Sequence, residues 1–122
     1  MMNPYLQVAI GGAIGSVARY GVYRALPGHG FALATFLVNV SGSLVMGLLA
    51  AMMAQRGGQA WTPFVMTGIL GGYTTFSAFS LDALALWERG QVAQMGLYVA
   101  GSVLLSLGAV FLGITIGRGF FA

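Results

Sequence analysis

Hydrophobic residues run along the chain in four long stretches, each separated from the next by a short group of polar residues, glycine or proline. A helix needs roughly 20 apolar residues to cross the hydrocarbon core of a bilayer. The stretches at 4–26, 31–53, 63–87 and 92–116 are long enough. The pattern therefore predicts an all-α membrane protein with four transmembrane helices.

The separators contain residues that end or begin helices. They are PGHG at 27–30, QRGGQ at 55–59 and ERGQ at 88–91, and proline and glycine are poor residues for continuing a helix. Thr62 followed by Pro63 is typical of an N-cap and a first helical residue. We therefore expect the third span to begin at Pro63, with a cap from the Thr62 side chain.

The stretch GGYTTFSAFS, residues 71–80, interrupts the third span with glycine, threonine and serine. Backbone groups freed by such a break persist in lipid only if they are buried in protein or bind something. We expect a break near residues 71–75 that begins at Gly71 and Gly72, with the helix resuming after Thr75. At a two-fold axis, the freed carbonyls of two copies would form an oxygen cage suited to sodium.

Composition supports a single membrane domain covering residues 1–122. The chain is 58% hydrophobic and 6% charged, whereas soluble domains average about 25% charged residues. The absence of cysteine excludes disulfides and thiolate catalysis. One histidine and two acids offer little for acid/base enzymology, and the arginines form no basic run that would bind nucleic acid. No removable signal peptide is evident.

The arginines barely specify an orientation in the membrane. Four spans place both termini and the second loop on one side, with Arg56 and Arg118. The other side has Arg24 and Arg89, with Arg19 about a turn deeper. Orientation follows the imbalance of such charges. Either another factor sets the orientation, or the chain inserts both ways and forms an antiparallel homodimer, which is an inverted repeat made from two copies.

Two sets of small or polar residues recur every four positions, which places each set on one helix face. The sets are Thr35, Asn39, Ser43 and Gly47 in the second span, and Tyr98, Ser102 and Ser106 in the fourth. Asn39 either makes an interhelical hydrogen bond or donates to a polar pathway. Together the two stripes could line a path for an ion that must replace its hydration. The Gly11 and Gly15 spacing favours close helix packing.

Four further side chains have two interpretations each. Arg19 and Asp82 either form an ion pair near one membrane face, which we favour, or Arg19 attracts an anion into a vestibule. Phe76 and Phe79 lie three residues apart on one face. They are either ordinary packing residues or rings whose positive edges contact an anion.

The chain resembles the Fluc or CrcB family of small dual-topology fluoride channels over nearly its full length. The motifs that carry the resemblance are GGAIGSVARY at 11–20, FLVNVSGSLVMG at 36–47 and GILGGYTTFSAFS at 68–80. The resemblance implies a passive fluoride channel of the cytoplasmic (inner) membrane, built as an antiparallel homodimer with two pores and a central structural sodium ion.

The resemblance also implies roles for individual residues. Gly71 and Thr74 would offer backbone carbonyls to sodium, and Arg19 matches the arginine of the first motif. The anion pathway would consist of Asn39, Phe76, Phe79, Tyr98, Ser102 and Ser106. Asp82 falls where relatives carry an acid, usually glutamate, and Ala78 replaces a threonine that relatives commonly have.

Two other functions are compatible with four short spans. A small proton-coupled multidrug exporter needs a titratable carboxylate inside the membrane, typically in the first span, and residues 4–26 contain no acid. A structural subunit of a larger membrane complex would explain the packing glycines. It would not explain two polar stripes beside a broken helix.

Overall fold

The computed structural model describes residues 2–26 and 30–122, and these residues form helices and turns without a strand. Three helices are long and continuous: α1 (Pro4–Ala25), α2 (Gly30–Arg56) and α5 (Val92–Phe120). The third hydrophobic stretch is divided into η1 (Gln59–Trp61), the π-helix η2 (Pro63–Leu70), α3 (Gly71–Tyr73) and α4 (Phe76–Glu88). Residues 27–29 of the expected PGHG turn lie outside the described residues.

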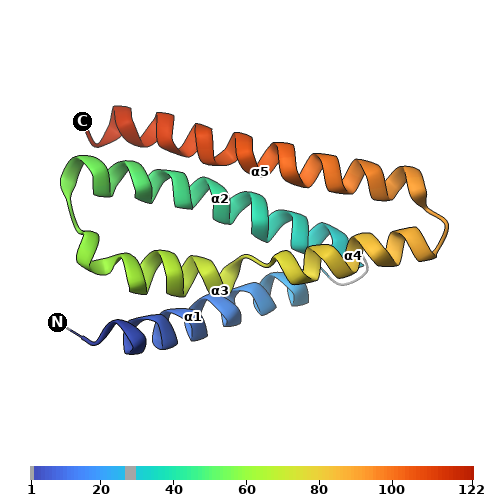
Figure 1. Ribbon diagram of the computed structural model, residues 1–122, viewed down its shortest axis with the longest axis horizontal. Coiled ribbons are helices and arrows are strands. Elements are labelled where there is room, and N and C mark those ends of the chain that lie inside the picture. The colour runs from blue at the N-terminus through green and yellow to red at the C-terminus, as the bar shows by residue number, and fades with distance from the viewer. Residues whose placement is uncertain (1, 27–29) are drawn as a thin grey trace.

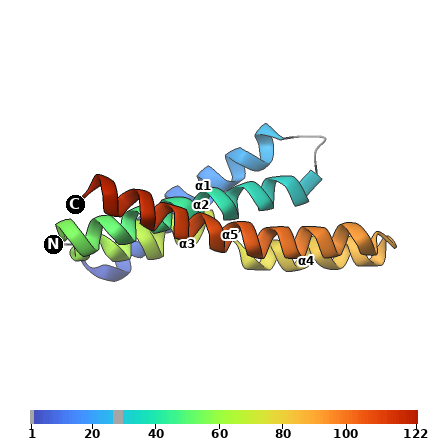
Figure 2. The same ribbon diagram turned by 90° about the horizontal axis from the view of Figure 1, so that it is seen from above.

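The helices run up and down, and both termini lie at the same end of the molecule (Figure 1). Contacts divide them into two main pairings: α2 packs along α5, and α1 packs along η2 and α3. The two pairings meet where α2 contacts α1, η2 and α3, and α4 packs against α5 and α2. At the other end, the last turns of α1 and the first turns of α2 diverge from α4 and α5 (Figure 2).

Glycines form the seam of each pairing. A Cβ at Gly11 would overlap the carbonyl oxygen of Phe64, and one at Gly15 would overlap that of Ile69, so α1 touches the backbone of η2. In the other seam, a Cβ on Gly47 would lie 3.1 Å from the Cα of Gly113. Small residues allow such close approach in lipid, where packing rather than the hydrophobic effect drives helix association.

Three segments of the described chain are long and apolar enough to cross a membrane: Ala32–Arg56, Gln59–Glu88 and Val92–Phe120. The expectation of four such helices is therefore met only in part, because α1 is a regular helix of 22 residues but is not among them. Its sequence includes Arg19 and Arg24 along with several glycines, and these residues lower its mean hydropathy.

The third hydrophobic stretch begins at Pro63 but not with the expected cap. Thr62 already has helical angles, with φ −53° and ψ −46°, and its side chain caps no backbone N–H. Its hydroxyl instead donates to the Met53 sulfur at 3.4 Å. This contact connects the start of η2 to the end of α2.

Most of the apolar surface faces outward. Only 28%, 17% and 11% of the most hydrophobic windows of the three membrane-competent segments is buried. Large side chains such as Leu97, Leu104 and Phe111 are exposed along α5. Exposed apolar area of this extent suits contact with lipid or with another membrane helix.

The α1 seam generates a prediction about stability. Gly15→Ala should destabilise the protein by about 1 to 3 kcal/mol, because the new methyl group meets the backbone of η2 and overpacks the seam. Gly21→Ala is the matched control, since a Cβ there meets nothing within 4 Å. Thermal unfolding of both variants in detergent tests this, and equal midpoints would contradict the seam.

Candidate functional site

The interruption of the third stretch lies at Thr74 and Thr75. Thr74 has φ −87° and ψ 157°, and Thr75 has φ −153° and ψ 116°, so both are extended. The break thus lies within residues 71–75, but it does not begin at Gly71 and Gly72, because both glycines remain in α3 and Gly71 has φ −63° and ψ −35°. Glycine permits a break but does not impose one, and the bonds that hold the extended pair come from elsewhere.

The side-chain amide of Asn39, in α2, binds both the N–H and the carbonyl of the extended residue Thr75. The Thr75 N–H donates to Oδ1 of Asn39 at 2.8 Å, and Nδ2 of Asn39 donates to the Thr75 carbonyl at 3.1 Å. A side-chain amide thus replaces the two backbone partners that a helix would have provided. The interhelical hydrogen bond considered for Asn39 is therefore present.

The two threonines of the break complete the helix ends around it. Thr74 donates both its N–H and its hydroxyl to the Leu70 carbonyl, at 3.0 and 2.9 Å. Thr75 is the N-cap of α4, and its hydroxyl oxygen accepts the N–H of Ala78 at 3.1 Å. Ala78 therefore contributes its backbone N–H, and not its side chain, to the hydrogen bonds of the site. This cap could have been read from the sequence as a threonine three residues before Ala78.

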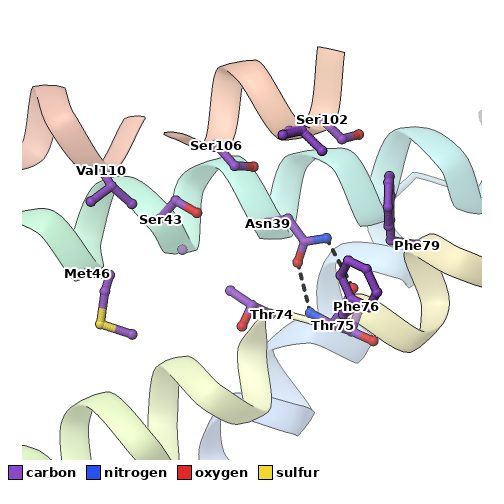
Figure 3. Close-up of a pocket in the computed structure, with 12 residues that line it drawn as sticks. Asn39, Ser43, Met46, Thr74, Thr75, Phe76, Phe79, Ser102, Ser106 and Val110 are labelled. Carbon is purple, nitrogen blue, oxygen red and sulfur yellow. Dashed lines mark hydrogen bonds between the residues drawn. The ribbon is translucent and has the colours of Figure 1, made fainter. Parts of the chain in front are cut away.

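A cavity of about 300 Å³ opens beside the break, between α2, the break and α5. Figure 3 shows Asn39 bonded to Thr75 on one side of it, with Ser102 and Ser106 projecting from α5 on the other. The lining has no charged side chain and consists of Asn39, Gly42, Ser43, Met46, Thr74, Thr75, Phe76, Phe79, Ser102, Val103, Ser106 and Val110.

Ser102 and Ser106 of α5 bring hydroxyl groups to the lining of this cavity. Ser102 is 5% exposed, and its Oγ has no hydrogen-bond partner among the described residues. Some other hydroxyls in these helices donate to the carbonyl four residues earlier, as Ser80 does to Phe76 and Thr115 to Phe111. A buried hydroxyl without a partner costs about 1 to 3 kcal/mol, so an occupant that accepts a hydrogen bond would stabilise this site.

Phenylalanine rings lie at one end of the cavity. The centroids of Phe76 and Phe79 are 5.4 Å apart, and both rings line the cavity. Phe79 is buried at 8% exposure, whereas Phe76 is 77% exposed. The Phe79 ring also lies 5.3 Å from the ring of Tyr98, which is itself not in the lining. The polar stripe of α5 therefore divides, with Tyr98 against the Phe79 ring and the serines in the cavity.

The residues of the stripe on α2 likewise make different kinds of contact. Thr35 is fully buried and shares a hydrogen bond of 2.7 Å with the hydroxyl of Tyr23. Asn39 and Ser43 line the cavity, and Gly47 packs on α5.

The ion pair expected between Arg19 and Asp82 does not form in the described structure. Nε of Arg19 donates to the Gly72 carbonyl at 3.0 Å. Asp82 accepts the hydroxyl of Tyr98 at 3.1 Å instead. The two side chains lie on helices with different neighbours: α1 packs against η2 and α3, while α4 packs against α5 and α2.

The carbonyl groups assigned to a cation by resemblance have no competing partner. Within residues 2–26 and 30–122, the Gly71 and Thr74 carbonyl oxygens accept no hydrogen bond. Neutral carbonyl oxygens are ligands of hard cations such as sodium. No group of histidine, cysteine or acidic side chains suited to a metal ion occurs in the described residues, so any cation here would depend on backbone oxygens.

Comparison with known proteins assigns the chain to a family. A family model described as "CrcB-like protein, Camphor Resistance (CrcB)" matches residues 6–114. A protein of Paracoccus denitrificans named "Fluoride-specific ion channel FluC" is 59% identical, with all of both chains covered. Proteins with that designation from Nitrobacter hamburgensis (FluC 2) and Cereibacter sphaeroides are 51% and 49% identical, over 93% and 100% of this chain and 96% and 100% of theirs.

These matches extend over nearly the whole chain and agree with the apolar helices described above. The protein is therefore a multi-pass protein of the cell membrane. The chain belongs to the CrcB family.

Proposed function

We propose that this protein is a fluoride-selective ion channel, and not an enzyme, that allows passive fluoride export across the cytoplasmic membrane. The observation that carries the proposal is the uncharged cavity beside the break, in which the Ser102 hydroxyl is buried without a partner among the described residues. The relatives named as fluoride-specific channels, at up to 59% identity, support it.

The chemistry of the lining suits a small, strongly hydrated anion. A pore must replace the hydration shell and still release the ion, so donors should be numerous and none should bind too strongly. The hydroxyls of Ser102 and Ser106 can donate, as can the Nδ2 hydrogen of Asn39 that is not bonded to Thr75. The positive edges of Phe76 and Phe79 would add weak attraction. A fixed cation in the lining would instead trap the anion.

Passive export is useful because of the acid-base chemistry of fluoride. Hydrofluoric acid enters a cell as a neutral molecule and dissociates at neutral pH. The resulting anion is trapped inside, and a channel lets it leave down its gradient. No proton-carrying carboxylate in the pathway is needed for this.

The proposal includes an antiparallel homodimer with two pores. Phe76 is 77% exposed and lies beside the break, where the Gly71 and Thr74 carbonyls accept no hydrogen bond within the described residues, and such a polar backbone surface is poorly matched to lipid. A second, inverted copy would cover it and would close the open side of each cavity. The near balance of arginines across the membrane supports insertion in both orientations.

A structural sodium ion is part of the same proposal. The unpaired carbonyls of Gly71 and Thr74, from each of two copies, are the groups that would hold it. When bound, the ion would neutralise the partial negative charge that collects at the carbonyl ends of two helices.

The alternatives explain fewer of these observations. A proton-coupled drug exporter needs an accessible carboxylate, but Asp82 accepts a hydrogen bond from Tyr98 and is absent from the cavity lining. A purely structural subunit has no use for an unpaired serine hydroxyl in a cavity.

Fluoride flux from proteoliposomes is the direct test. Purified protein should release fluoride at a rate far above that of empty vesicles when followed with a fluoride electrode, and chloride release should stay near the background. Well-folded protein that releases no fluoride would refute the proposed function.

Removal of the buried hydroxyl separates ion binding from folding. Ser102→Ala should reduce fluoride flux by about tenfold while stability stays equal or rises, because the hydroxyl has no protein partner to lose. Thr115→Val is the control, since that hydroxyl donates to a helix carbonyl and is exposed on α5. Unchanged flux in Ser102→Ala, measured beside its unfolding temperature, would remove this hydroxyl from the pathway.

Dual insertion can be tested with a single cysteine, because the chain has none. Ala60→Cys places a thiol in the exposed second loop without disturbing the positive φ angles of Gly57 and Gly58. An impermeant thiol reagent added outside intact cells should label about half of the copies. Labelling of all copies or of none would show a single orientation and would exclude the antiparallel dimer.

A further inference from the structure

The break leaves a set of carbonyl groups at the end of α3 that can be accounted for one by one. The Leu70 carbonyl accepts both donors of Thr74, and the Gly72 carbonyl accepts Nε of Arg19. Those of Gly71, Tyr73 and Thr74 accept nothing within the described residues. The last carbonyls of a helix lack intrahelical partners, and in lipid each needs one. Arg19 therefore supplies a partner that the chain break removed.

The packing of α1 on α3 makes this contact specific. A Cβ on Gly72 would lie 2.7 Å from the Gly12 carbonyl oxygen and 3.2 Å from the Ser16 nitrogen, so the two backbones touch one turn before Arg19. The arginine is half-buried and reaches across 53 residues of sequence to the helix end. A side chain fixed at its base by such a seam loses little further freedom when it forms the bond.

We infer that Arg19 is a positioning residue that caps the carbonyl end of α3, and that it thereby determines which carbonyls of the break remain free for a cation. The first part rests on the hydrogen bond itself. The second rests on the proposed function, since it concerns the sodium ion. Neither role matches the ion pair or the anion vestibule that the sequence suggested for this residue.

The chemistry of arginine suits the cap. A guanidinium donates N–H groups in a fixed plane and stays charged at any physiological pH. Positive charge at the C-terminal end of a helix is stabilised by the helix dipole. The same charge repels a cation held nearby. The cap and the charge therefore act on sodium binding in opposite directions, and this difference allows them to be separated by experiment.

Hydrogen exchange on the intact dimer in detergent tests the cap without any measurement of flux. In Arg19→Met, the N–H groups of residues 72–74 should exchange about tenfold faster, because the last turn of α3 frays when a bond to a charged donor is lost. The Thr75 N–H, held by Asn39, should change less and serves as an internal reference. Arg19→Lys, which can still donate, should lie between Arg19→Met and the parent protein.

Arg24→Met is the matched control, because it removes an equal charge from the same helix at an exposed position. Its exchange should equal that of the parent protein. Equal exchange in Arg19→Met and the parent would overturn the cap. If Arg19→Met yields no dimer, Arg19→Gln provides the same comparison with a side chain too short to reproduce the arginine's reach.

Sodium dependence tests the second part. The sodium concentration that gives half-maximal fluoride flux should rise about tenfold in Arg19→Met, because the frayed end no longer presents the Gly71 and Thr74 carbonyls together. Loss of charge alone would lower that concentration. A fall, or no change, would overturn the role in selecting carbonyls. If the parent protein shows no fluoride flux, the proposed function fails, and the exchange data still decide whether Arg19 caps α3.

Discussion

The structure depends on one constraint: a span that is interrupted within a membrane must find new partners for its backbone polar groups. The extended residues Thr74 and Thr75 can exist here because Asn39 receives one N–H and donates to one carbonyl. A single amide on a neighbouring helix thus stands in for two helical hydrogen bonds. Without it, a continuous helix would be the cheaper conformation, and the cavity would lose one of its walls.

The glycine seams bring the partners of the break within reach. Gly11 and Gly15 let α1 touch the backbone of η2, and Gly47 and Gly113 do the same for α2 and α5. The first seam fixes α1 relative to η2 and the second fixes α5 relative to α2, while Gly42 lets α2 approach Thr74 of the break. The two serines of α5 consequently face the break across the cavity. The close packing of glycines therefore forms the site, although the glycines have no side chain that could bind an ion.

The few charged groups near the centre are withdrawn from the cavity lining. Arg19 bonds to a carbonyl at the end of α3, and Asp82 accepts a hydrogen bond from Tyr98, with neither residue in the cavity lining. What remains in the lining is neutral: amide, hydroxyl, ring and aliphatic groups. Neutral donors can replace the hydration of an anion without holding it, which is the property that conduction requires.

The sequence by itself determined the helical class, the hydrophobic stretches, the presence of a break near GGYTTFSAFS and several polar residues of the cavity, because apolar length and four-residue periodicity are local properties. Only the tertiary structure decided where the break lies and which residues are hydrogen-bond partners. Gly71 and Gly72 suggested a break that instead falls at Thr74 and Thr75, where Asn39 can reach the backbone. Arg19 and Asp82 suggested an ion pair, but their helices pack on different neighbours. Hydrogen-bond partners 36 or 53 residues apart are set by packing, and no local pattern encodes that packing.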